Sequence, residues 1–340
     1  MAMSATRRMI PSTSASTRRG TTVNGGSSVC FLRAQQQQQQ QRQQRRAASF
    51  LRYAGASGRA MTTATDDVDR NDIVDVWCFD ARTIGEDEDT ESGRGRRARA
   101  YAALTREERE ELSASALRAY ARAFTRKTLM RYVKDGAGGD PQRVVFALGA
   151  RGKPRVSAPS ELTSVGFSVS HCDGLVAVCV TRGGECGVDV EDVNRRRGSD
   201  VNKLATRWLS ARELATVEGT EDADERARVF MQTWTVKEAY VKATGLGIAG
   251  RPFREFDVDI DVSSGRLELS DGEAGEAWRV ALIQPNPETS HALALCAPPT
   301  SRGGLPEIRL RWASPFDDHD GDDHIDVSPH IVVASDVRRA

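Results

Sequence analysis

Short apolar runs recur along most of the chain, and many of them alternate with polar residues. An alternation with a period of two is typical of strands, because successive side chains point to opposite faces of a sheet. The runs that predict strands lie at 73–79, 144–148, 166–170, 175–181, 186–191, 256–261, 266–269, 278–283 and 292–296. After Ala297 the pattern fades into a segment that contains Pro, Asp and His, and its structure is left open.

Two helices are predicted to begin at capping boxes, in which a Ser or Thr and a Glu three residues later satisfy the first backbone N–H groups. One box begins at Thr105, and its helical segment runs to Val133 with a break near Ser113. Its apolar stripe consists of Leu117, Tyr120, Phe124 and Leu129. The other box begins at Ser210 and predicts a short helix.

Strands and helices follow one another in a similar order twice, which predicts an α+β fold in two similar halves. We place the N-terminal half at 66–170, the C-terminal half at 171–300 and a tail of open structure at 301–340. A long helix is predicted from about residue 222 to Gly245, where glycine can adopt the left-handed conformation that ends a helix. The charged, Gly- and Arg-rich stretch 85–99 predicts an exposed loop.

Residues 1–65 differ in composition from the rest of the chain. They contain ten arginines, no Asp or Glu, and a glutamine run at 35–41. This composition is typical of an organellar transit peptide, and the arginines at 45–54 are spaced as in a mitochondrial presequence. A plastid address stays open, and so does a disordered extension of a cytosolic protein, because such polar chain cannot form a core.

From Asp66 onward the chain is acidic, with 38 basic and 48 acidic residues. This balance argues against generic nucleic-acid binding through a basic surface. No apolar run reaches the length that spans a membrane. The six cysteines show neither C-x-x-C pairs nor zinc-ligand spacing, so we expect reduced thiols rather than a disulfide framework.

The strand GVDVE, residues 187–191, holds two carboxylates on one face. Its period of two sends Asp189 and Glu191 to the side opposite its valines, about 7 Å apart along the strand. Two oxygen ligands without a neighbouring His or Cys suit a hard cation such as Mg²⁺. The alternative is a solvated strand face above a buried valine face.

The stretch WTVKEAYVKATG, residues 234–245, contains two of the six lysines in a chain with 42 arginines. Glu238 and Lys242 are four residues apart and therefore share one helix face, with Trp234 one turn earlier. A lysine ammonium is a compact charge that suits a phosphate oxygen. The alternative is an ordinary surface pair of glutamate and lysine.

Two further residues lie where a strand meets a turn and could therefore reach a ligand. Lys153 lies in the turn GKP, and His171 follows the strand FSVS. A protonated imidazole there could contact phosphate, and a structural role in the turn is the alternative.

Four motifs, in this order, are GKP, FSVSH, GVDVE and WTVKEAYVKATG. Together they resemble the 4′-phosphopantetheinyl transferases, specifically the surfactin-synthetase-activating type with two halves in one chain. The resemblance covers roughly 73–297. It implies two halves related by a pseudo-twofold axis, each a small antiparallel sheet packed with helices. It also implies coenzyme A held between the halves, Mg²⁺ on its diphosphate, and transfer of phosphopantetheine to a serine of an apo carrier protein.

The resemblance also implies residue roles. Asp189, Glu191 and Glu238 resemble the acidic metal site, Lys242 the contact with the diphosphate, and Glu238 and Lys242 the catalytic pair. Whether Glu238 takes the serine proton stays open, because a carboxylate bound to metal is a weaker base. Implied coenzyme A contacts are Lys153, Ser170 and His171, and the basic residues for the 3′-phosphate are Arg106, Arg109 and Arg122.

Two other classes of protein stay open as alternatives. A metal-dependent phosphodiesterase or nuclease would also use clustered carboxylates, although a second metal would need further Asp or His ligands. A catalytically silent coenzyme A-binding module would need no carboxylate trio. We expect a monomer that binds neither nucleic acid nor membrane, and we leave the identity of the carrier open.

Overall fold

The computed structural model describes residues 72–84, 90–133, 139–149, 151–196, 200–272, 277–316 and 325–335. The predicted transit peptide, residues 1–65, lies outside these ranges. Within them the fold is α+β, as predicted, with two large sheets and a separate hairpin. No helix in the described ranges has the length and apolar character needed to cross a membrane.

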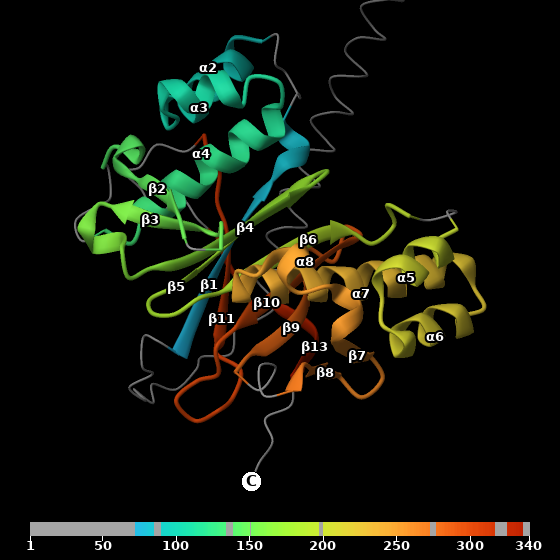
Figure 1. Ribbon diagram of the computed structural model, residues 1–340. Helices are drawn as coiled ribbons and strands as arrows, with labels where there is room; N and C mark the ends of the chain where they lie inside the picture. The colour runs from blue at the N-terminus through green and yellow to red at the C-terminus, as the bar shows by residue number, and fades with distance from the viewer. Residues whose placement is uncertain are drawn as a thin grey trace, which may run out of the picture. The chain divides into compact units, whose positions relative to one another are not determined.

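The first sheet has five strands in the order β12-β11-β1-β5-β4. Figure 1 labels four of them, β11, β1, β5 and β4. Its strands are β1 (Ile73–Asp80), β4 (Gly166–Cys172), β5 (Leu175–Thr181), β11 (Glu307–Trp312) and β12 (Ile325–Val327). The helices of this half are α2 (Glu91–Ala102), α3 (Arg106–Glu111) and α4 (Ala116–Met130). The boundary that we placed after residue 170 falls inside β4, so the hairpin of β4 and β5 spans it.

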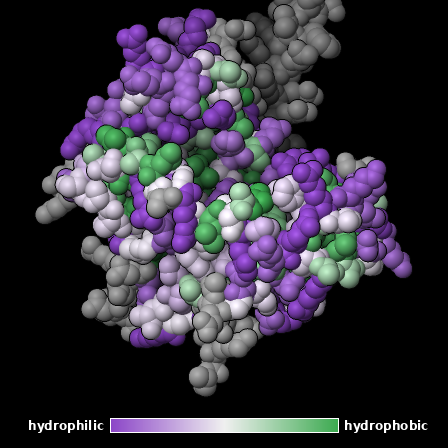
Figure 2. Space-filling view, in the orientation of Figure 1, coloured by the Kyte–Doolittle hydropathy of each residue, from purple (hydrophilic) through white to green (hydrophobic). Residues whose placement is uncertain are grey.

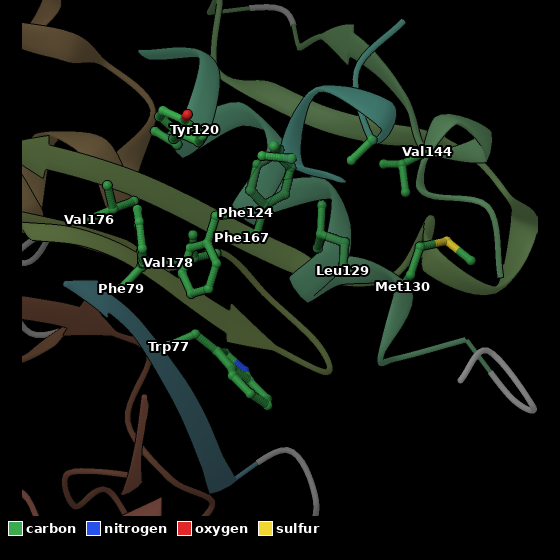
Figure 3. Close-up of a cluster of buried hydrophobic side chains, with 14 of the residues drawn as sticks. Trp77, Phe79, Tyr120, Phe124, Leu129, Met130, Val144, Phe167, Val176 and Val178 are labelled. Carbon is green, nitrogen blue, oxygen red and sulfur yellow. The ribbon is translucent and has the colours of Figure 1, made fainter. Parts of the chain in front are cut away.

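A hydrophobic core joins α4 to the first sheet (Figure 3). The predicted stripe supplies it, since Tyr120, Phe124 and Leu129 are all buried. From the sheet come Trp77 and Phe79 of β1, together with alternate residues of β5. The period of two along β1 and β5 thus directs one set of side chains toward α4 and leaves the other set for the opposite face.

The second sheet has six strands in the order β6-β10-β9-β13-β8-β7. Its strands are β6 (Gly187–Asp192), β7 (Asp257–Asp261), β8 (Arg266–Ser270), β9 (Arg279–Gln284), β10 (His291–Ala297) and β13 (His330–Ser335). The helices of this half are α5 (Asn202–Trp208), α6 (Ala211–Gly219), α7 (Ala223–Thr244) and α8 (Gly247–Gly250). Helix α7 ends at Gly245, which has a φ of 69° in the left-handed region, as predicted.

The two large sheets share a core between them. It contains Val74 and Val76 from the far face of β1, Val188 and Val190 from β6, and apolar residues of β5, β9, β10 and β11. Because Val188 and Val190 of β6 face this core, Asp189 and Glu191, which alternate with them, face away from it. Each sheet is mostly antiparallel, as predicted, but each also contains one parallel pair, β1 with β11 and β13 with β8.

The prediction of an exposed loop at 85–99 is wrong for its second part. Helix α2 begins at Glu91, and the side chain of Thr90 accepts a hydrogen bond from the Gly93 backbone N–H. The stretch has no apolar stripe that would have indicated a helix, yet arginine and alanine are both good helix formers. The pattern also missed β3 (Pro154–Ala158), which pairs with β2 (Val145–Leu148) in the separate hairpin.

Candidate active site

A pocket of about 330 Å³ lies where strands β4 and β6 meet helix α7. It therefore combines residues of the first sheet with residues of the second sheet and its helix. Its lining residues are Val169, Ser170, His171, Asp189, Glu191, Trp234, Glu238 and Lys242. All three carboxylates that the sequence singled out, together with Lys242, thus line one pocket.

Gly187 brings helix α7 close to strand β6. A Cβ at this position would lie 2.0 Å from the Ala239 carbonyl oxygen and 2.5 Å from the Ala243 backbone nitrogen. Only a residue without a side chain permits so close an approach. The strand that carries Asp189 therefore packs directly against the turn of α7 that carries Glu238.

Asp189 is buried, with 6% of its side chain exposed. Its Oδ1 accepts a hydrogen bond of 2.7 Å from the Ser170 hydroxyl and another of 2.7 Å from the Lys242 ammonium. Its Oδ2 is also buried but has no hydrogen-bond partner among the described residues. A buried acceptor without a partner is costly, so this oxygen is a candidate ligand for a cation.

The other two carboxyl groups of the pocket have raised pKa values. Burial, together with repulsion from Asp189, raises the pKa of Glu191 to about 7, although the nearby Arg195 guanidinium opposes the shift. Burial raises the pKa of Glu238 as well, and Asp189 adds to the effect. A bound cation would stabilise the ionised form of both carboxyl groups, because its charge would offset the cost of burial and the repulsion from Asp189.

The donor set fits a hard cation such as Mg²⁺, since it consists of carboxylate oxygens, and two of them, Asp189 Oδ2 and Glu191 Oε2, have no hydrogen-bond partner among the described residues. The described ranges, however, contain no group of three or more His, Cys, Asp or Glu side chains that is already arranged to hold a metal ion. The ammonium of Lys242 instead neutralises Asp189, and Arg195 Nη1 lies 2.8 Å from Glu191 Oε2.

A second pocket of about 330 Å³ adjoins the first, since both are lined by Val169 and His171. Figure 2 shows apolar surface around a hollow near the middle of one face. The walls of this pocket are apolar and aromatic, with two arginines. Its other lining residues are Leu112, Arg118, Ala121, Arg122, Thr125, Phe146, Ala147, Leu148, Pro154 and Phe167.

Arg122 lines this second pocket together with His171. Its guanidinium pairs with Glu108 at 2.9 Å and lies over the Phe146 ring at 5.1 Å. Arg118, which sequence reasoning did not single out, lines the same pocket. It lies one helix turn before Arg122, and this spacing could have indicated it.

Lys153 lines neither of these two pockets. Its ammonium donates to the carbonyl of Cys186 at 2.7 Å and to that of Ala243 at 3.3 Å, and it pairs with Glu185 at 2.8 Å. In this arrangement it ties the start of β6 to the end of α7. The predicted contact of Lys153 with coenzyme A stays a prediction.

Arg106 and Arg109 are exposed and also lie outside both pockets. Arg106 pairs with Glu110, while Arg109 donates to the Tyr101 carbonyl. The structure thus places Arg122 beside a ligand-sized pocket and keeps the other two arginines on the surface. The 3′-phosphate contacts predicted for Arg106 and Arg109 stay predictions.

Comparison with known proteins identifies the class to which this site belongs. The sequence profile of the 4′-phosphopantetheinyl transferase superfamily matches residues 185–296, which include the three carboxylates and Lys242. The chain is 29% identical over 176 residues to the 4′-phosphopantetheinyl transferase HetI of Nostoc, covering 51% of this chain and 70% of that protein. It is 34% identical over 141 residues to the 4′-phosphopantetheinyl transferase AcpT of Salmonella typhimurium, covering 42% and 67%.

The chain belongs to the 4′-phosphopantetheinyl transferase superfamily, as the four motifs predicted. Membership in the surfactin-synthetase-activating type stays a prediction. The chain spans 41% of the L-aminoadipate-semialdehyde dehydrogenase-phosphopantetheinyl transferase of Eremothecium gossypii, with 31% identity over 116 residues and 33% of this chain covered. The holo-[acyl-carrier-protein] synthase of Thermotoga maritima aligns with a TM-score of 0.26 and 25% identity, covering 33% of this chain and 60% of that one.

Proposed function

We propose that the chain transfers 4′-phosphopantetheine from coenzyme A to a serine of an apo carrier protein and releases adenosine 3′,5′-bisphosphate. One observation carries the proposal: Asp189, Glu191, Glu238 and Lys242 converge on a single pocket inside the segment that matches the superfamily. A phosphoryl-transfer site needs cations around the oxygens on which charge develops, and this pocket offers a lysine and a set of carboxylates for a metal.

The two adjoining pockets suit the 3′-phosphoadenosine and the diphosphate of coenzyme A. In the second pocket, Phe146 and Phe167 provide apolar surface for a base, and Arg118 and Arg122 provide positive charge for a 3′-phosphate. His171 lies between this pocket and the carboxylates, so it can contact a phosphate from either side. The diphosphate would then lie in the first pocket, within reach of the Lys242 ammonium.

Asp189, Glu191 and Glu238 would hold Mg²⁺. When bound, the ion would neutralise charge on the diphosphate oxygens and on the leaving phosphate. Lys242 adds a second positive charge and orients the same phosphate. In the transfer, the serine oxygen of the carrier forms a bond to the phosphorus next to pantetheine. The bond from that phosphorus to the bridging oxygen breaks, and the electron pair leaves with adenosine 3′,5′-bisphosphate.

Glu238 is our candidate for the group that takes the serine proton. Burial raises its pKa in the metal-free protein, whereas a bound cation would lower that pKa, so the strength of Glu238 as a base depends on whether it holds the metal at that moment. The candidate substrates are fatty-acid, polyketide and aminoadipate-pathway carriers. The last of these is suggested by the name of the Eremothecium relative.

Mass spectrometry of the carrier tests the proposal. Purified residues 66–340, incubated with coenzyme A, Mg²⁺ and each apo carrier, should add one phosphopantetheine mass to at least one carrier. A carrier whose acceptor serine is replaced by alanine should gain nothing. Cleavage of coenzyme A without modification of a carrier would indicate a phosphodiesterase instead. Binding of coenzyme A without any turnover would indicate a silent module.

The leader, residues 1–65, is proposed to direct the enzyme into mitochondria or plastids, because it is rich in arginine and contains no acidic residue. Fused to a fluorescent protein, it should place the signal inside one of these organelles. A control in which its ten arginines are replaced by glutamine should stay in the cytosol. A cytosolic signal from the unaltered leader would refute the address.

A further inference from the structure

Ser170, Asp189 and Lys242 form a closed set of hydrogen bonds on one side of the active-site pocket. The Ser170 hydroxyl and the Lys242 ammonium each lie 2.7 Å from Asp189 Oδ1, and they are 3.1 Å from each other. Both bonds to Asp189 therefore end on the same oxygen. The second oxygen, Oδ2, is buried without a hydrogen-bond partner in the described structure.

The chemistry of these groups fixes the direction of each hydrogen bond. An ammonium can only donate, so Ser170 Oγ must accept from Lys242. The serine proton is then left for Asp189 Oδ1, since a carboxylate can only accept. Ser170 therefore accepts a hydrogen bond from Lys242 and donates one to Asp189, and its proton has one defined position. It also keeps its bond to Asp189 if Lys242 turns toward a phosphate, which leaves the serine as the constant partner of this carboxylate.

We propose that Ser170 is a positioning residue that holds Asp189 by Oδ1 and so presents Oδ2 to Mg²⁺. The inference rests on the metal site of the proposed function. It differs from the contact with coenzyme A that the resemblance implies for this serine. Groups that orient a metal ligand by a hydrogen bond reduce metal affinity when removed, typically by 10- to 100-fold.

Strand β4 also contains a matched control. Ser168 is buried like Ser170 and faces the same side of the strand, two residues earlier. Its hydroxyl accepts a hydrogen bond of 3.2 Å from the Val188 backbone N–H, and among the described residues it makes no hydrogen bond to a carboxylate. Both serines thus join β4 to β6, but only Ser170 contacts a candidate metal ligand.

Metal binding without coenzyme A is the measurement that separates the two roles of Ser170. Titration of the protein with Mn²⁺, followed by the loss of the free-ion paramagnetic resonance signal, gives the dissociation constant. The pair Ser170→Thr and Ser170→Val compares two β-branched side chains of similar shape, of which only threonine keeps the hydroxyl. We expect Ser170→Val to bind Mn²⁺ about tenfold more weakly, and we expect Ser170→Thr and Ser168→Ala to stay within about twofold of the unmodified protein.

Equal Mn²⁺ affinity in Ser170→Val and Ser170→Thr would overturn the proposal, and so would an unmodified protein that binds no Mn²⁺. If Ser170→Val lost only affinity for coenzyme A, the serine would be a substrate contact instead. Thermal unfolding of each variant shows whether it is folded, and Ser170→Ala provides a smaller replacement if Val is not tolerated. A protein that binds Mn²⁺ as expected but modifies no carrier would refute the proposed function and leave the role of Ser170 intact.

Discussion

At the scale of single residues, the active-site pocket gathers negative charge at the expense of stability. Glu191 and Glu238 have raised pKa values because they are partly buried near Asp189. Asp189 itself is paired with Lys242 and Ser170. The three carboxylates therefore differ in the way they affect the metal-free protein, although all three line one pocket. Groups gathered for function commonly reduce stability in this way.

Glu238→Gln and Asp189→Asn should both abolish most transfer, but they should differ in stability. Glu238→Gln removes a partly buried negative charge that Asp189 repels, so the melting temperature of the metal-free protein should rise. Asp189→Asn abolishes the ion pair with Lys242 and leaves at most a hydrogen bond, so no such rise is expected. Carrier modification and thermal unfolding, measured on the same preparations with chelator present for the unfolding, test both. Near-normal transfer in both variants at saturating Mg²⁺ would contradict the site.

Glu191 should make the stability of the metal-free protein depend on pH. Its pKa is about 7 in the folded protein instead of the usual 4.5, so the folded state binds the proton more tightly than the unfolded state. The loss of stability caused by ionised Glu191 is therefore fully present above about pH 7. It decreases as the pH falls from 7 toward 4.5, because Glu191 then binds a proton in the folded protein. Glu191→Gln should be more stable than the unmodified protein at pH 8, and the difference should shrink by pH 5. A difference that stays constant across this range, in denaturant unfolding with chelator, would contradict the shift.

At the scale of secondary structure, the sequence predicted the elements with local signals and missed those without them. Both capping boxes and the glycine that ends α7 are confirmed, because each depends on a few neighbouring residues. Helix α2 was missed because its arginine-rich sequence has no apolar stripe. The structure of β13 was left open because its apolar run, 331–333, is short and follows a stretch that is rich in Asp and His.

The same distinction applies to the candidate site. The strand period places Asp189 and Glu191 on one face of β6, and the helix period places Glu238 and Lys242 on one face of α7. The structure brings all four residues to one pocket. The contacts of Lys153 with the Cys186 and Ala243 carbonyls depend on the packing of distant segments. No local pattern in the sequence contains that information.

Gly187→Ala tests the contact between β6 and α7. The added Cβ would overlap the backbone of α7 at Ala239 and Ala243, which cannot move as a flexible side chain would. We expect a loss of about 1–3 kcal/mol in unfolding free energy, together with weaker Mn²⁺ binding, because Glu238 moves with the helix. Gly219→Ala is the control, since its Cβ would meet nothing within 4 Å. Stability unchanged in Gly187→Ala would show that the helix can shift at little cost.

At the scale of the whole molecule, the segment after residue 300 belongs to both large sheets. Strand β11 pairs in parallel with β1, and Arg311 forms an ion pair with Asp75 across that pair. Strand β13 lies between β9 and β8, with Val333 buried in the core beneath α7. The tail is therefore part of the fold that supports the pocket, even though the sequence pattern left its structure open.

Removal of β13 should consequently weaken the second sheet and the active site together. A chain that ends at residue 328 loses the strand between β9 and β8, and with it the burial of Val333, which alone contributes about 2 kcal/mol. The Ser335 hydroxyl, which accepts from the Val280 backbone N–H, is lost as well. A chain that ends at Ser335 keeps all of β13 and is the control. We expect a lower melting temperature and weaker Mn²⁺ binding only in the shorter chain, because α7 packs on this sheet and carries Glu238 and Lys242. If both chains melted and bound Mn²⁺ alike, β13 would not support the pocket, and β8 would have to be held in place without it.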